Sequence, residues 1–105
     1  MNADFSLTSE LVENKLTIKT TGYVNNNGGQ LLFQEYEKFK NQNPSEVVLD
    51  LADTTVVNSI GISYLIEMIE NLNDNNGKLY FTNINQAIEK TFTIMGLFQF
   101  AQKLD

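Results

Sequence analysis

The stretch that decides the fold runs from Glu46 to Gly61 and reads EVVLDLADTTVVNSIG. Its first part, Val47 to Leu51, is a nearly continuous apolar run, which predicts a central strand covered on more than one side. A polar loop that contains the apolar pair Val56-Val57 follows, and Asn58 and Ser59 then lead into a helix. A short polar side chain at a helix start caps free backbone N–H groups, and the same position favours an anion.

Hydrophobic periodicity on either side of this stretch predicts the remaining elements. We expect strands over residues 4–12, 16–24, 46–51 and 78–84, helices over 29–41, 60–73 and 86–95, and a short final strand or irregular tail over 100–104. A tight turn at Glu13-Asn14-Lys15 makes the first two strands a hairpin. The alternation that follows predicts one α/β domain over residues 1–105, a mixed β-sheet with an N-terminal hairpin, parallel central strands and about three to four helices packed on it.

Composition excludes several classes of function. The 105 residues include no cysteine and no histidine, which removes thiolate chemistry, the usual general base at neutral pH and the commonest metal ligands. We therefore expect no enzyme, no cofactor and no metal site. The formal net charge of −6 disfavours nucleic acid as a partner. No signal peptide and no apolar segment of roughly 20 residues is visible, so we expect a cytoplasmic protein without membrane insertion.

Several motifs in this order resemble the STAS domain of the anti-sigma factor antagonists of bacterial partner switching. The family pattern is an apolar strand ending in Asp-Leu, a loop, and Asp-Ser-Ser-Gly opening a helix. This chain has Val48-Leu49-Asp50-Leu51 and then Asn58-Ser59-Ile60-Gly61. Gly22, Gly77-Lys78-Leu79 and Gly96-Leu97-Phe98 match further family positions. Two departures stand out, because Asn58 replaces the aspartate and Ile60 replaces the second serine.

The resemblance implies a function that rests on Ser59, which aligns with the serine that a partner kinase phosphorylates in the antagonists. It implies an anti-sigma factor of the serine protein kinase type as the partner, with a phosphatase as a further partner. The partner-binding residues that it implies are in the corner at 58–61 and on the exposed side of the second helix: Asn58, Ser59, Ile60, Gly61, Tyr64 and Met68. Tyr64 and Met68 are expected on a flanking face of that helix, as a partly exposed pair that is either the edge of the core or a contact surface.

Other interpretations remain open for the same residues. Asn58 and Ser59 can simply cap the helix, and the whole chain can be an accessory STAS module of a transport ATPase or a signalling assembly, without phosphorylation. Asp50, at a strand end, invites comparison with response-regulator receivers, but a receiver's acidic pair is missing, and we expect Asp50 to bond backbone groups in the loop before the corner. Gly28-Gly29 lacks the spacing and the lysine of a phosphate-binding loop, so a turn and helix cap are expected there.

Overall fold

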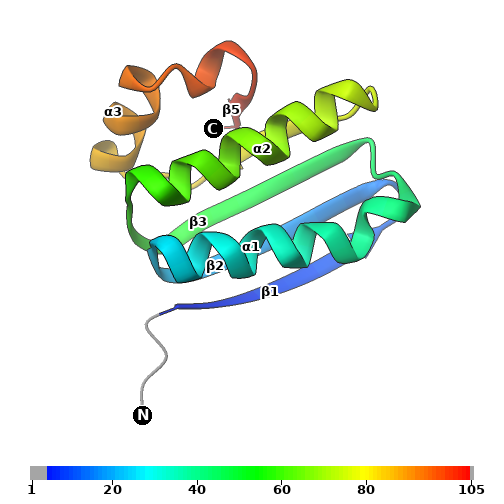
Figure 1. Ribbon diagram of the computed structural model, residues 1–105, viewed down its shortest axis with the longest axis horizontal. Coiled ribbons are helices and arrows are strands. Elements are labelled where there is room, and N and C mark those ends of the chain that lie inside the picture. The colour runs from blue at the N-terminus through cyan, green and yellow to red at the C-terminus, as the bar shows by residue number, and fades with distance from the viewer. Residues whose placement is uncertain (1–4, 105) are drawn as a thin grey trace.

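The computed structural model describes residues 5–104. Strands and helices alternate after an opening hairpin (Figure 1). The described elements are β1 (Phe5–Val12), β2 (Lys15–Val24), α1 (Asn26–Phe39), the 3₁₀ turn η1 (Lys40–Gln42), β3 (Glu46–Val57), α2 (Ser59–Asp74), β4 (Lys78–Thr82), α3 (Gln86–Ile94), the 3₁₀ turn η2 (Leu97–Gln99) and β5 (Gln102–Leu104). Asp4, which was expected in the first strand, lies outside the described residues.

Within residues 5–104 the strands form one five-stranded sheet in the order β1-β2-β3-β4-β5. The hairpin pair β1 and β2 is antiparallel, and the other neighbouring pairs are parallel. Glu13 makes the hairpin turn with a positive φ of 57°. The predicted mixed α/β sheet with an N-terminal hairpin and parallel central strands is therefore confirmed, and residues 102–104 take the strand alternative predicted for the tail.

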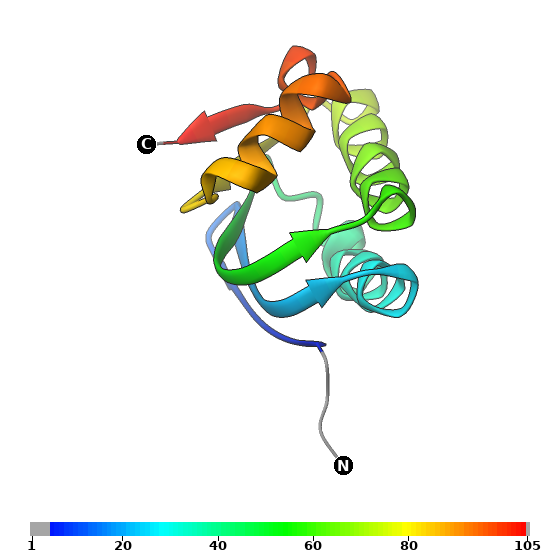
Figure 2. The ribbon, with the colours of Figure 1, turned by 90° about the vertical axis from the view of Figure 1, so that its left-hand side faces the viewer.

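The core lies against one face of this sheet. Residues that share a row across the strands, such as Leu16 with Val47 and Leu79, are at most 1% exposed. Figure 2 shows α1 and α2 side by side against the twisted sheet, with α3 further along, close to β5. On the other face, Lys19 is exposed and Asp50 is half-buried. The expectation that β3 is covered on more than one side holds only at Val48, which points to this other face and is 7% exposed.

β3 is longer than predicted, because the supposed loop after Leu51 continues to pair with β2. The register shifts twice, and β3 carries an extra residue between the pairs Lys19–Asp50 and Thr21–Asp53 and another between Gly22–Thr54 and Tyr23–Val56. Such bulges interrupt the apolar alternation that marks a strand. Thr20 and Thr54 are buried beside the bulges, and their hydroxyls are 2.5 Å apart. The bulges turn Val57 inward, next to the start of α2.

The helices begin where an asparagine accepts a hydrogen bond from a backbone N–H two or three residues into the helix. Asn25 Oδ1 accepts from Gly28 N at 2.9 Å, so α1 begins at Asn26 rather than at the predicted Gly29 or Gln30. Asn85 does the same for α3, with its Oδ1 2.8 Å from Ile88 N. Both caps use an oxygen acceptor on a short side chain, which is the residue type that helix N-termini prefer.

Candidate functional site

Residues 46–61 end in a corner where two strand-to-helix connections lie side by side. β2 runs into α1 through Asn25, and β3 runs into α2 through Asn58. The strand ends are paired, since Val24 is in register with Val57 and Asn58 N donates to Val24 O at 3.1 Å. Figure 1 shows both helices starting at this end of the molecule. The corner is thus a surface made by two helix N-termini, and we call residues 56–61 with Tyr23 the corner surface.

Asn58 is the residue that caps α2. Its Oδ1 accepts from Gly61 N at 2.8 Å, and its backbone carbonyl accepts from Ile62 N at 2.9 Å. Its Nδ2 reaches Asn26 Oδ1 at 3.4 Å, which connects the starts of α2 and α1. Ser59 is the first residue inside the helix and is exposed. The capping interpretation is therefore right for Asn58, and the hydroxyl of Ser59 is not the capping group.

Glycines allow the close approach of backbones at the corner. A Cβ on Gly61 would stand 2.3 Å from Val24 O, and a Cβ on Gly29 would stand 2.7 Å from the Tyr64 ring. Real Cβ atoms do not approach so closely, so each position needs a residue without a side chain. Gly61 therefore determines how closely the start of α2 approaches the end of β2.

The predicted partner-binding residues divide into exposed and buried ones. Ser59 is exposed and Ile60 is 45% exposed, while Asn58 and Tyr64 are half-buried. Tyr64 packs toward Phe33 of α1, with the ring centroids 6.1 Å apart. Gly61 is buried, so it can shape the site but offers little surface to a partner.

Met68 does not belong to the exposed side of α2. It is 0% exposed, and the prediction of a partly exposed flank at Met68 is wrong. Leu65, Met68 and Leu72 follow one another at helical spacing and are all buried, so they form one stripe toward the core. The flank is covered because α1 packs beside α2, an arrangement that the sequence of α2 alone does not contain.

Sequence reasoning missed two residues beside the corner. Tyr23 is 38% exposed and Val56 is 46% exposed, and they are in register at the paired ends of β2 and β3. With Ile60 they add apolar area to the surface that carries Ser59. The adjacent pair Val56-Val57 could have predicted an exposed apolar side chain here, because successive residues of a strand point to opposite faces of the sheet.

The electrostatics of the corner favour negative charge on Ser59. Neither α1 nor α2 has an acidic residue in its first turn, although the chain as a whole carries a formal net charge of −6. The N-terminal end of each helix carries a partial positive charge from its backbone dipoles. A phosphate at the first helical position would thus meet two helix starts and no carboxylate on their first turns.

Asp50 lies on the open face of the sheet. Its Oδ1 accepts from Ala52 N at 3.0 Å and from Asn83 Nδ2 at 3.0 Å. The predicted bond to a backbone group is present, although Ala52 belongs to β3 and not to a loop. Among residues 5–104 no group of three histidine, cysteine, aspartate or glutamate side chains is arranged to hold a metal ion. Over the same part of the chain no helix is long and apolar enough to cross a membrane.

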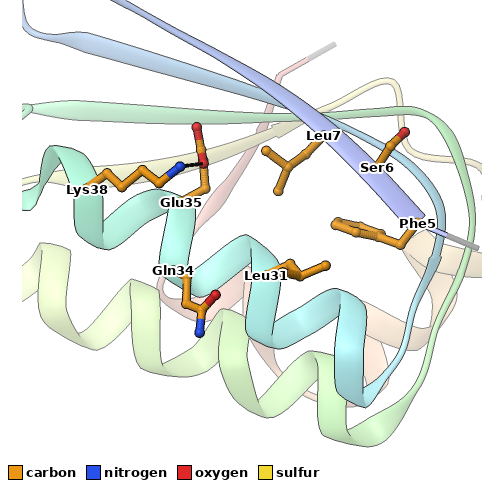
Figure 3. A pocket seen from close by; sticks show the side chains of 7 residues that line it. All are labelled: Phe5, Ser6, Leu7, Leu31, Gln34, Glu35 and Lys38. Atoms are coloured by element: carbon orange, nitrogen blue, oxygen red, sulfur yellow. Dashed lines mark ion pairs between the residues drawn. The ribbon is translucent and has the colours of Figure 1, made fainter. Parts of the chain in front are cut away.

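A separate hollow lies between β1 and α1 (Figure 3). Its charged residues are Glu35 and Lys38, which form an ion pair at 3.0 Å. Ser9 also donates a hydrogen bond to the Glu35 carboxylate. The Ser9 hydrogen bond, helped by Lys38, holds the pKa of Glu35 below its ordinary value of 4.5, against the opposing effect of burial. Through the Ser9 hydrogen bond, the Glu35 carboxylate thus links β1 to α1.

The chain is similar to known proteins in its sequence family and in its fold. A model of the STAS domain family matches residues 6–104. An anti-sigma factor antagonist from Mycobacterium paratuberculosis is 18% identical, with a TM-score of 0.82 over 96% of this chain and 86% of that chain. A protein of Thermotoga maritima described as an anti-sigma factor antagonist is 14% identical, with a TM-score of 0.85 over 94% of this chain and 86% of that chain. The Bacillus cell-fate determinant SpoIIAA in its phosphorylated form is 13% identical, with a TM-score of 0.76 over 95% of this chain and 92% of that chain. These likenesses concern the fold.

Proposed function

Because the chain belongs to the STAS domain family, we propose that it is an anti-sigma factor antagonist-like regulator of bacterial partner switching. In this proposal it binds an anti-sigma factor of the serine kinase type in the cytoplasm through the corner surface. The kinase phosphorylates Ser59, which breaks the complex, and a phosphatase restores it. The chain is the substrate of these steps and catalyses nothing itself.

The observation that carries the proposal is that Asn58, and not Ser59, caps α2. Asn58 makes the cap, with its Oδ1 2.8 Å from Gly61 N, while Ser59 is exposed at the first helical position. The hydroxyl can therefore be modified without removing the cap that starts α2. The change from aspartate to asparagine keeps the acceptor oxygen that the cap needs, and it leaves the target without an adjacent negative charge.

A phosphate on Ser59 would act as a local switch. It adds about 1.5 to 2 negative charges and three acceptor oxygens, and a helix start tolerates them. The same charge beside Val56 and Ile60, which are 46% and 45% exposed, is costly for a partner that buries these apolar side chains. A structural neighbour, SpoIIAA, is known in a phosphorylated form, which agrees with a phosphorylated state on this fold.

The direct test is phosphorylation by the cognate kinase with ATP, followed by mapping of the site by mass spectrometry. We expect one phosphate on Ser59 of the parent chain and none on Ser59→Ala. Ser63 offers a matched control, because it is exposed on the next turn of α2 and its hydroxyl already donates to Ile60 O at 2.6 Å. Ser63→Ala should therefore be phosphorylated like the parent. A phosphate found elsewhere, or none at all, would refute the switch.

Partner retention separates the switch from an accessory role. In co-purification from the native host, Ser59→Ala should keep the kinase and Ser59→Asp should lose it. Equal retention of a partner by both variants, or recovery of a transport ATPase in place of a kinase, would support an accessory STAS module instead. The exposed position of Ser59 ensures that the two variants differ in charge at the surface and not in the packing of the core.

A further inference from the structure

A second apolar surface lies at the other half of α2, away from the corner. A hollow of about 140 Å³ opens between α2 and the segment that follows α3. We call it the α2–η2 groove, and its lining residues are Ile66, Ile69, Glu70, Asn73, Met95, Gly96, Leu97 and Phe100. Ile66 and Asn73 are seven and fourteen residues after Ser59, which places the groove roughly 10 to 20 Å along the helix axis from the phosphorylation site.

The groove is built by the way the chain turns after α3. Gly96 has a φ of 78°, and the turn that it makes sends Leu97 into the core, where it is 2% exposed. Met95 and Phe100, on either side of η2, remain 47% and 64% exposed. The turn is held by its own backbone, since Ala101 N and Phe100 N both donate to Leu97 O, at 3.0 and 3.1 Å. The hollow is therefore preformed and does not need a ligand to open it.

Its size and lining fit one apolar side chain of a partner. An apolar cavity of ~150 Å³ accommodates a benzene-sized group, so a leucine or phenylalanine side chain would fill this hollow. Ile94, next to Met95 in the sequence, is 72% exposed but is not a lining residue of the hollow. Phe100 and Ile94 are among the most exposed large apolar side chains of the described chain, and exposed apolar area of this kind marks contact sites.

The charge around the groove selects the kind of partner. Glu70 is the charged residue in the lining, and Glu67 and Asp74 lie one turn from it on the exposed side of α2. Two lysines lie outside the lining: Lys90 of α3, one helical turn before Ile94, and Lys78 of β4, which lines an adjoining hollow with Asn73 and Phe100. The acidic edge and the net charge of −6 disfavour a second copy of this chain and an anionic lipid surface. They favour a segment that carries lysine or arginine beside its apolar anchor.

We propose that the α2–η2 groove is a second docking site, which binds a basic amphipathic helix of another protein. The helix inserts one leucine- or phenylalanine-sized side chain between Ile69 and Phe100, and a basic residue one turn away pairs with Glu70. This site does not use Ser59, so the chain holds this partner in either phosphorylation state of the corner. The proposal does not depend on the switch, and either can fail alone.

Two synthetic helical peptides with identical apolar positions test the groove, one with lysines and the other with glutamates flanking the anchor. They are titrated into the isotope-labelled full chain and followed by NMR. The lysine peptide should cause saturable shifts of the Met95 methyl group and of the Asn73 and Phe100 amides, and the glutamate peptide should cause none. No saturable shift, an equal response to both peptides, or shifts caused by raising the protein concentration alone would each overturn the proposal.

Variants assign the binding to the named residues. Phe100→Ala should lower the affinity for the lysine peptide about tenfold, as expected for an anchor contact. Glu70→Lys should lower that affinity about threefold to fivefold. Glu10→Lys is the matched control, because Glu10 is exposed on β1 and the variant has the same change in net charge. It should bind like the parent, as should Ser59→Asp. Equal weakening by Glu10→Lys would mean non-specific charge attraction and would reject the site.

Discussion

At the scale of single residues, the choice of asparagine at position 58 has a simple physical reason. A helix cap needs an acceptor oxygen, and Asn58 Oδ1 supplies it to Gly61 N at 2.8 Å. An aspartate would supply the same oxygen, with a charge that the helix start also favours. The departure from the family pattern therefore keeps the cap, removes the charge next to Ser59 and adds the amide donor that reaches Asn26 Oδ1 at 3.4 Å.

Replacing Asn58 should reveal the cap as a measurable contribution to stability. Asn58→Ala should lower the free energy of unfolding by about 1 kcal/mol, and Asn58→Asp should leave it nearly unchanged at neutral pH. Urea denaturation followed by circular dichroism measures both. Asn27→Ala is the control, because Asn27 is exposed in the first turn of α1 and is not the cap residue, and it should stay within about 0.5 kcal/mol of the parent. An equal loss in Asn27→Ala would argue against the cap.

Gly61 gives a prediction whose sign opposes that expected from helix propensity. Within a helix, alanine is normally more stable than glycine by up to about 1 kcal/mol. At Gly61 the new Cβ would lie 2.3 Å from Val24 O, so Gly61→Ala must push α2 away from β2. We expect a loss of roughly 1–3 kcal/mol in the free energy of unfolding, measured in urea. An increase in stability would show that the helix start yields easily to the added methyl group.

At the scale of elements, the order of strands and helices was predictable because each one carries its own periodicity. β3 was predicted to end at Leu51 because Asp53, Thr54 and Thr55 do not alternate in the way that a strand requires. Its continuation depends on two bulges and on pairing with β2, which is distant in the sequence. Bulges follow from the partner strand as much as from local sequence, so the local pattern could not give them.

The exposed side of α2 was predictable only in part for a related reason. Hydrophobic periodicity predicted the helix, but the width of its covered face depends on which elements pack beside it. Met68 is buried, whereas Ile66 is half-buried and lines the α2–η2 groove. A helix pattern gives the direction of the core, and the neighbouring helix and turn decide which flank remains open.

The contact between β1 and α1 should make stability depend on pH. The Ser9 hydrogen bond and the Lys38 ion pair lower the pKa of Glu35 below its ordinary value of 4.5. The unfolded chain therefore binds this proton at a higher pH than the folded chain does. The contribution is fully present above the unfolded pKa, and it is lost as the pH falls through the lower folded pKa of Glu35.

Ser9→Ala tests this contact. It should lower the free energy of unfolding by about 1 kcal/mol at pH 7, because it removes the donor that stabilises the carboxylate. The difference from the parent should shrink as the pH falls below the ordinary pKa of Glu35, as measured by urea unfolding across the acid range. Thr8→Ala, at an exposed neighbouring position of β1, controls for strand propensity. A Ser9→Ala deficit that stays constant with pH would assign the loss to packing rather than to the carboxylate.

At the scale of the whole molecule, the candidate site joins segments from different parts of the chain. Ser59 and Ile60 were identified from the sequence because they sit in a recognisable motif. Tyr23 joins them only because β2 and β3 end together, in a register that sequence periodicity does not give. The acidic residues of a chain with a net charge of −6 are absent from the first turns of α1 and α2. The fold and the charge distribution therefore both favour a negative group at the end of the molecule where α1 and α2 begin.

The proposed switch predicts that charge on Ser59 changes binding while the fold persists. Ser59 is exposed at the first position of α2, where a negative side chain stabilises a helix by about 0.3–1 kcal/mol at low salt. Ser59→Asp should therefore raise the thermal midpoint by a few degrees, since 1 kcal/mol corresponds to roughly 4–8 °C for a domain of this size. The gain should fade as salt is added, because exposed charges are screened.

Ser63→Asp is the control for this effect, because Ser63 lies a full turn further into α2 and its hydroxyl donates to Ile60 O. It should give a smaller rise in the thermal midpoint or none, since the dipole effect is confined to the first turn. A marked fall in the midpoint of Ser59→Asp would mean that phosphorylation acts by loosening α2. An unchanged or raised midpoint together with loss of the kinase would locate the switch on the surface, where a charged group meets the exposed side chains of Val56 and Ile60.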